Sequence, residues 1–267
     1  MLILFFLLKE SWQFFQNVKL GDFLFGEKWH PISTPPKFGI LPLIVGTFFV
    51  TITAMLISIP LGVGCAVYIA EIANNRIKEY LKILVELIAG IPSVVLGFLG
   101  LLILAPYTRD LLNLSTGLTA FTGAVILAFM AIPTIATISE DAINSVPREY
   151  REAALALGAT RWLTITQIII PAAFSGILAA ILLGVGRVIG ETMVVMMVCG
   201  NASIIPKSIF QPVRTMTATI ASEMGETVRG SLHYEALFAI GLLLFIISFC
   251  INFLADIAVR RRGFKSR

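Results

Sequence analysis

The sequence is short of charge. Lys, Arg, Asp and Glu together make up 13% of its 267 residues, whereas a typical soluble domain has about 25%. Hydrophobic residues make up 57% of the chain, and the mean hydropathy is +0.91. So few charged groups cannot cover a water-exposed surface. The composition therefore excludes a soluble domain and predicts an integral membrane protein.

Several catalytic and metal-binding motifs are also missing. No glycine is followed by lysine, so the sequence lacks the phosphate-binding loop G-x-x-x-x-G-K-[ST] of nucleotide hydrolases. Neither H-E-x-x-H nor G-x-S-x-G occurs. We interpret the two histidines, His30 and His233, as solvated groups, and the three distant cysteines argue against a disulfide framework. We expect no catalysis, no metal site and no cofactor site in this chain.

Five apolar segments are long enough to cross a hydrocarbon core, which takes about 20 residues. They lie near residues 40–70, 83–105, 117–138, 172–199 and 235–259. A sixth apolar stretch, residues 1–8, is too short to span and is followed by the polar and aromatic sequence KESWQFF, typical of a membrane interface. We interpret residues 1–39 as a partial first transmembrane helix followed by an outside segment, and residues 40–259 as the membrane domain.

Basic residues indicate the orientation of the chain. Five of the last eight residues are Lys or Arg, and cytoplasmic segments are enriched in these residues. We therefore expect a basic cytoplasmic tail at 260–267 and long outside connections, including one at 200–234. The charged residues of that last connection, which we expect to be mostly solvated, are Lys207, Arg214, Glu223, Glu226 and Arg229.

Residues 140–171 form the longest polar connection on the expected cytoplasmic side. Pro147 suits the first turn of a helix, REYREAALALGA is rich in strong helix formers, and Gly158 suits the residue that follows a helix. The segment predicts a short helix, a turn, and an amphipathic helix that lies along the membrane surface and ends at Pro171. Such a segment can anchor to the interface or dock into a groove of a partner.

The same connection resembles the EAA motif of ABC-importer permeases, E-A-A-x3-G-x9-I-x-L-P. The matching residues are Glu152, Ala153, Ala154, Gly158, Ile168 and Pro171, and Ile170 replaces the leucine. In that family the segment is a coupling helix, seated in a cleft of a separate ATPase. The resemblance implies an all-α, type I ABC-importer permease core with six transmembrane helices. It also implies that ATP and Mg are bound by a partner ATPase, to which Glu152, Ala153, Ala154, Gly158 and Pro171 couple this chain.

Other segments narrow the resemblance to the phosphate-specific permeases. GRVIGETMVVMMVCGN at 186–201 resembles their R-x-I-G-E-T-M…G-N signature, and similar stretches occur at 26–47, 89–98 and 206–226. The last of these favours the C-type subunit. The resemblance implies inorganic phosphate as substrate, an A-type permease paralogue and an ATPase dimer as partners, and an extracytoplasmic phosphate-binding protein. A permease for another oxyanion, molybdate or sulfate, is the nearest alternative.

Arg187 and Glu191 interrupt the apolar run at 172–199. A charge at the bilayer centre costs about 2.5–3.5 kcal/mol on insertion scales. Their spacing places them on one face of a continuous helix, where they could simply neutralise each other. Alternatively, Arg187 could attract an oxyanion through two parallel hydrogen bonds, while Glu191 accepts one from a phosphate that keeps a proton. The pair could also form a gate. We expect both residues on the substrate path.

Overall fold

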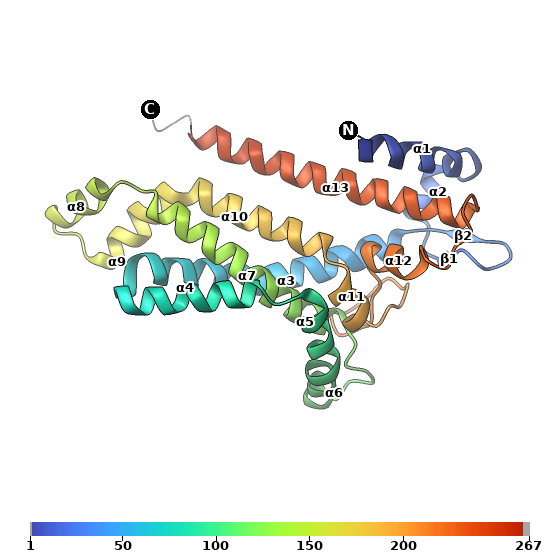
Figure 1. Cartoon of the computed structure of the whole chain (residues 1–267), viewed down its shortest axis with the longest axis horizontal. Helices are drawn as coiled ribbons and strands as arrows, with labels where there is room; N and C mark the ends of the chain where they lie inside the picture. The colour runs from blue at the N-terminus through green and yellow to red at the C-terminus, as the bar shows by residue number, and fades with distance from the viewer. Residues whose placement is uncertain (1, 264–267) are drawn as a thin grey trace. The chain divides into compact units, whose positions relative to one another are not determined.

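The computed structural model describes residues 2–263 and is mainly helical (Figure 1). Its contacts divide the chain into two compact units. Unit 1 comprises residues 2–54, 92–127 and 189–249, and unit 2 comprises residues 55–91, 128–188 and 250–263. Each unit contains part of the four longest helices, which are α3 (Leu41–Val67), α7 (Ala120–Asn144), α10 (Ile170–Gly190) and α13 (Leu232–Gly263).

Five helical stretches in the described residues are long and apolar enough to cross a membrane. They are Leu41–Ile72, Ser93–Leu112, Ala120–Asn144, Arg161–Gly190 and Leu232–Leu254. Their number is the one predicted, and the all-α membrane class is confirmed. Helix α1 (Leu2–Asn17) is not among them, and it includes KESWQFF, the stretch that we interpret as typical of a membrane interface.

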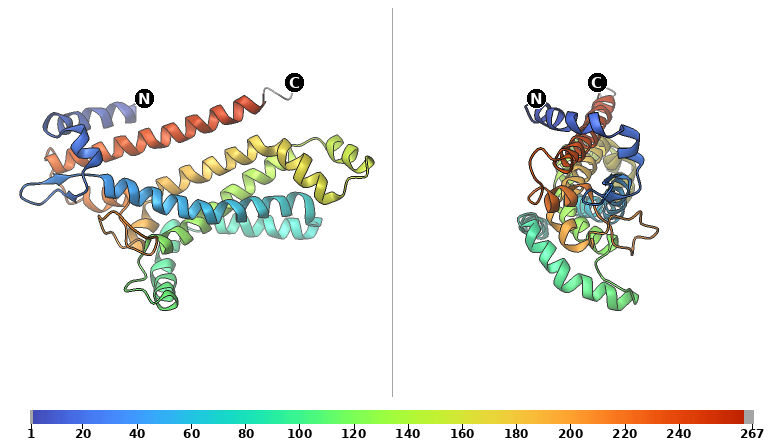
Figure 2. Two further views of the ribbon diagram at one scale, coloured as in Figure 1. Left: turned by 180° about the vertical axis from the view of Figure 1, so that it is seen from behind. Right: turned by 90° about the vertical axis from the view of Figure 1, so that its right-hand side faces the viewer.

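The core of unit 1 is built around aromatic side chains. Helices α1 and α2 (Leu20–Phe25) are followed by a two-stranded antiparallel hairpin, β1 (Trp29–His30) and β2 (Lys37–Phe38). The side chains that these elements bury are Phe14, Phe23, Trp29 and Phe38, together with Met216 and residues at the start of α13. Each such side chain contributes roughly 1.5–3 kcal/mol of burial free energy. Figures 1 and 2 both show α1 lying beside the first half of α13.

The remaining helices of unit 1 are short. They are α5 (Ser93–Leu99), the π-helical turn η2 (Gly100–Leu104), α6 (Ala105–Leu112), α11 (Met193–Val198) and α12 (Met216–Glu223). Helix α5 packs closely on α11, because a Cβ atom at Gly97 would lie 3.0 Å from the Sδ of Met197. Helix α12 and the first residues of α13 lie within the connection at 200–234, which we expected to be a mostly solvated loop.

Unit 2 contains the turn η1 (Tyr68–Ile72), α4 (Asn75–Ala89), α8 (Arg148–Ala156), α9 (Arg161–Thr164) and the turn η3 (Ile165–Ile169). Two glycines let its long helices approach one another. A Cβ atom at Gly62 of α3 or at Gly184 of α10 would lie 2.8 or 2.9 Å from the side chain of Ile135 in α7. A second apolar cluster, which includes Ala66, Ile143 and Ile169, lies at the end of these helices next to α8.

Three predicted boundaries were wrong. The span predicted at 83–105 is broken, since α4 ends before Gly90 and Pro92 is the N-cap of α5, and both residue types interrupt helices. Residues 161–190 form one span, so no separate surface helix ends at Pro171; the π-helical turn η3 precedes that proline and lets the helix continue past it. Residues 260–263 of the predicted tail end α13, and residues 264–267 lie outside the described residues.

Candidate functional site

Arg187 lies in the last turn of α10, in unit 2, and its side chain is exposed. Its Nη1 donates a hydrogen bond to the Thr134 hydroxyl at 2.7 Å, and Thr134 follows the internal Pro133 of α7. This bond uses one of the five N–H donors of a guanidinium. The structure therefore orients Arg187 from α7 while its fork retains donors that can bind an anion.

Glu191 belongs to unit 1 and lies just beyond the end of α10. Its Oε1 accepts a hydrogen bond from the backbone N–H of Met193 at 3.1 Å, which replaces a helical bond at the start of α11. The prediction that Arg187 and Glu191 share one face of a continuous helix was wrong, because α10 ends at Gly190. Their roles on the substrate path stay predictions.

The backbone of Glu191 is fixed to the start of α12. The Thr217 hydroxyl donates to the Glu191 carbonyl oxygen at 2.9 Å and lies 3.1 Å from the Thr215 hydroxyl. Thr215 is the N-cap of α12, accepting from the Ala218 N–H at 3.2 Å. The N–H of Met216 donates to the Thr47 hydroxyl of α3 at 3.0 Å. The start of α12 is thus tied both to the segment of Glu191 and to α3.

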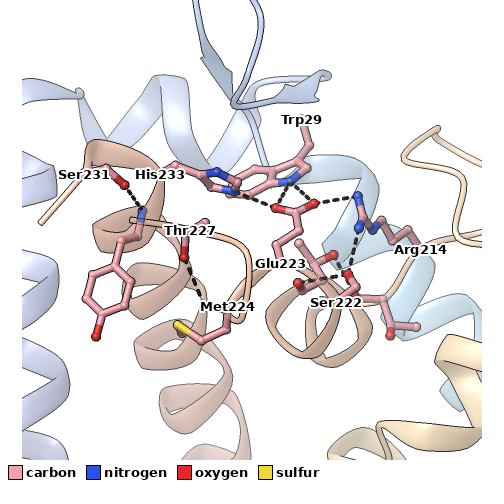
Figure 3. Close-up of polar contacts among 11 residues, drawn as sticks. Trp29, Arg214, Ser222, Glu223, Met224, Thr227, Ser231 and His233 are labelled. Carbon is pink, nitrogen blue, oxygen red and sulfur yellow. Dashed lines mark hydrogen bonds and ion pairs between the residues drawn. The ribbon is translucent and has the colours of Figure 1, made fainter. Parts of the chain in front are cut away.

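The other end of α12 carries a buried polar cluster around Glu223 (Figure 3). The carboxylate accepts from Nε1 of Trp29 at 3.1 and 3.2 Å, and lies 2.8 Å from Nη1 of Arg214 and 2.7 Å from Nε2 of His233. Arg214 also donates to the Ser222 hydroxyl at 2.9 Å. The side chains of Arg214, Glu223 and His233 are 15–17% exposed, so the Arg214–Glu223 ion pair is largely shielded from water. One carboxylate therefore joins four segments of the chain.

Sequence reasoning missed this cluster. It predicted that Arg214, Glu223 and His233 are solvated, and the structure corrects this because α12 brings Glu223 against the hairpin. The remaining charged residues of that connection, Lys207, Glu226 and Arg229, are exposed as predicted. The one available signal was Trp29, whose indole N–H needs an acceptor when an apolar core buries the ring. An open pocket of about 1020 Å³ borders the cluster and is lined by residues 29–33, 203, 214, 222–223, 226–228, 231 and 233.

The EAA segment forms the predicted short helix and turn. Helix α8 has Pro147 as its N-cap, and Gly158, two residues after the helix, has φ +82°, a left-handed conformation that favours glycine. Glu152 and Ala153 are exposed, whereas Ala154 is buried. The structure therefore groups Glu152, Ala153, Ala154 and Gly158 in one helix and turn, and places Pro171 in the following span.

A second charged cluster of unit 2 surrounds Glu140. Glu140 near the end of α7 is 3% exposed and lies 3.3 Å from Nζ of Lys78 and 3.0 Å from Nζ of Lys82, both on α4. Asn144 donates to the same carboxylate at 2.9 Å. Within residues 2–263, no group of three or more His, Cys, Asp or Glu side chains is placed to hold a metal ion. Glu140 therefore ties α7 to α4.

Comparisons with known proteins relate the chain to transport permeases. Residues 58–263 match the family described as binding-protein-dependent transport system inner membrane component. The chain is 43% identical to the probable ABC transporter permease protein YqgH of Bacillus subtilis, over 85% of this chain and 74% of that protein. It is 36% identical to the phosphate transport system permease protein PstC of Mesorhizobium japonicum, over 94% and 81% of the two chains. Identity to PstC 1 of Mycobacterium tuberculosis is 35%, over 87% and 75%.

Solved structures of similar fold include ABC transporter chains. One belongs to the MetNI methionine ABC transporter in an inward-facing conformation, with a TM-score of 0.64 and 21% identity over 83% of this chain and 96% of that chain. Another belongs to the bacterial alginate ABC transporter in complex with its pentasaccharide-bound periplasmic protein, with a TM-score of 0.67 and 16% identity over 96% and 88%. At this identity the likeness establishes a common fold.

Proposed function

Because the chain belongs to the family of binding-protein-dependent transport system inner membrane components, we propose that it is a permease subunit of an ATP-driven importer of inorganic phosphate. Its fold is the type I ABC-importer permease fold implied by the EAA resemblance, and it is a multi-pass membrane protein. The observation that supports phosphate as the substrate is the similarity to a phosphate transport permease over 94% of the chain. A permease for molybdate or sulfate is the alternative.

Arg187 supplies the attraction for phosphate in this proposal. Its guanidinium is always charged, and its planar fork matches two oxygens of an oxyanion. The hydrogen bond to Thr134 holds the fork in one orientation and leaves donors for the substrate. Glu191 accepts a hydrogen bond from a phosphate that keeps a proton, which sulfate lacks at neutral pH. The two residues act as a selective path or as a gate that opens when phosphate passes.

The EAA segment couples this chain to ATP hydrolysis in the proposal. We assign ATP and Mg binding, and ATP hydrolysis, to a dimeric partner ATPase, so this chain is a transport subunit and not an enzyme. Glu152, Ala153, Ala154, Gly158 and Pro171 form the coupling region, and the exposure of Glu152 and Ala153 supports docking there. When ATP closes the partner dimer, displacement of α8 switches the spanning helices between inward-facing and outward-facing states.

Partners and orientation complete the proposal. One such chain pairs with an A-type permease paralogue to enclose the path, and an extracytoplasmic phosphate-binding protein delivers the substrate. The C-terminus lies in the cytoplasm, because five of the last eight residues are basic. This orientation puts α8 on the cytoplasmic side and the pocket beside Glu223 on the outside.

Uptake of labelled phosphate tests the proposal. Cells that lack their own high-affinity system express this chain with its partners as wild type, Arg187→Gln, Arg187→Lys and Glu152→Ala. We expect uptake by the wild type, competed by excess phosphate but not by sulfate or molybdate, and its loss in Arg187→Gln complexes that still assemble. Uptake of molybdate or sulfate instead of phosphate refutes the proposed substrate. Normal uptake by Arg187→Gln refutes the role of Arg187 on the path.

A further inference from the structure

Arg151, in the middle of α8, joins three elements of unit 2 through one guanidinium. Its Nε and Nη2 donate to Oε1 of Glu71 at 3.0 and 2.6 Å, and Nε also lies 3.4 Å from Oε2. Nη1 donates to the carbonyl oxygen of Val146 at 2.6 Å, and Nη2 to that of Ile143 at 3.0 Å. Glu71 belongs to η1, and the two carbonyls lie at and just beyond the end of α7.

These contacts occupy the ends of two spans. Glu71 is the second-last residue of the span Leu41–Ile72, and Ile143 is the second-last residue of the span Ala120–Asn144. The last four carbonyls of a helix have no helical donor. The Ile143 carbonyl accepts from the backbone N–H of Val146 at 3.2 Å as well as from Arg151, and the Val146 carbonyl accepts from Arg151, so the guanidinium caps the end of α7. The side chains of Arg151 and Glu71 are only 22% and 12% exposed, which limits screening of the pair by solvent.

Apolar contacts hold α8 only weakly. Ala154 is the buried residue among the nine of this helix, and it has the smallest side chain after glycine. The apolar cluster beside α8 is formed by Ile143, Val146 and Ile169 with residues of α3 and α10, and not by α8 itself. Residues 145–147 join α8 to α7 in the chain, and α8 packs on η3. The hydrogen bonds of Arg151 are therefore the principal noncovalent tie between α8 and the spans of α3 and α7.

We propose that Arg151, held by Glu71, is the positioning residue that carries displacement of α8 to α3 and α7. The inference rests on the proposed function, in which a partner ATPase moves α8. A planar fork suits this task because it binds a carboxylate and two backbone carbonyls in fixed directions at once. A lysine ammonium at this position could pair with Glu71 but lacks the planar set of N–H donors that binds both carbonyl oxygens at the same time.

The test compares ATP hydrolysis with phosphate uptake in proteoliposomes that contain the whole transporter and its binding protein, both normalised to assembled complex. For Arg151→Gln and Glu71→Gln we expect hydrolysis near the wild-type rate, whereas uptake per ATP should fall by about tenfold or more. A factor of this size is typical of the coupling between two sites of a protein. Arg151→Lys should lie between these variants and the wild type. The control is Arg76→Gln, which removes an exposed guanidinium from α4 and should change neither rate.

Two outcomes overturn the proposal. If both rates equal those of the wild type, Arg151 transmits nothing. If both rates fall in parallel, or neither glutamine variant assembles, Arg151 only stabilises the fold. A wild type that hydrolyses ATP but imports no phosphate refutes the proposed substrate instead. Uptake of molybdate or sulfate per ATP then still tests the link, because we expect Arg151→Gln to lower this ratio as it would lower phosphate uptake per ATP.

Discussion

Glu223→Gln isolates the electrostatic contribution of the cluster beside the pocket lined by Trp29 and His233. The amide keeps the shape of the side chain and can still accept a hydrogen bond from Trp29, but it leaves Arg214 as a buried, unpaired charge. Among the described residues the Nε of Arg214 is already buried without a hydrogen-bond partner, so the guanidinium has little means of compensation. The substitution therefore measures the free energy of unfolding that depends on the Arg214–Glu223 pair.

The magnitude follows from the burial of the pair. Removing one partner of a fully buried ion pair costs about 3–5 kcal/mol, because the other charge remains buried alone. The side chains of Arg214 and Glu223 are 17% and 15% exposed, so we expect a lower cost, about 2–3 kcal/mol. For a chain of this length the shift in Tm is about 2–4 °C per kcal/mol, which gives a decrease of roughly 4–12 °C.

Fluorescence of Trp29 is a suitable assay in mild detergent. Trp29 is 1% exposed, whereas Trp12 and Trp162 are each 67% exposed and can be replaced by Phe, so that the remaining signal reports on unit 1. The matched control is Glu226→Ala, which removes an exposed carboxylate three residues away and should change stability by less than about 0.5 kcal/mol.

A double variant decides whether the unpaired charge is the cause. Glu223→Gln combined with Arg214→Gln removes both charges, and it should be less destabilised than Glu223→Gln alone. The reasoning is refuted if Glu223→Gln unfolds at the same temperature as the wild type. It is also refuted if the double variant is as unstable as the sum of the two single variants, because the two side chains would then contribute independently.

Three further predictions concern single positions. Gly158→Ala forces a side chain into a left-handed conformation and should lower the free energy of unfolding by about 1 kcal/mol. It should also weaken co-purification with the ATPase, whereas Gly21→Ala, at an exposed position with open space, should have neither effect. Burial raises the pKa of the Cys199 thiol to about 12. In a variant that lacks the other two cysteines, a maleimide should therefore label Cys199 between pH 7 and 9 only after the protein is unfolded. Labelling of the folded protein would contradict this prediction. Gly62→Val should clash with Ile135 and lower the yield of folded protein, and Ile135→Ala in the same chain should restore it; no rescue would mean that another contact limits the site.

The parts of the fold that depend on local chemistry were predictable from the sequence. The five spans follow from the length of the apolar segments, which must match the hydrocarbon core. Helix α8 follows from Pro147 at its start and Gly158 after its end, since both residues act through their own backbone conformation. The family resemblance also rested on residues close together in sequence.

The parts that depend on distant residues were not predictable. Trp29 and Glu223 are 194 positions apart, and periodicity carries no signal for a hydrogen bond over that separation. The link between Arg151 and Glu71 spans 80 positions in the same way. The end of α10 at Gly190 was missed because the apolar run continues through α11, so hydropathy alone cannot detect that the chain turns there.

The π-helical turns η1, η2 and η3 have a consequence for the evolution of chain length. Each lies inside one of the membrane spans and contains i→i+5 hydrogen bonds, so it holds one residue more than an α-helical turn. An insertion or deletion of one residue there interchanges a π turn and an α turn without breaking the helix. Single-residue gaps between this chain and its relatives should therefore fall within residues 68–72, 100–104 and 165–169. Elsewhere in a span, an inserted or deleted residue would shift every following side chain around the helix.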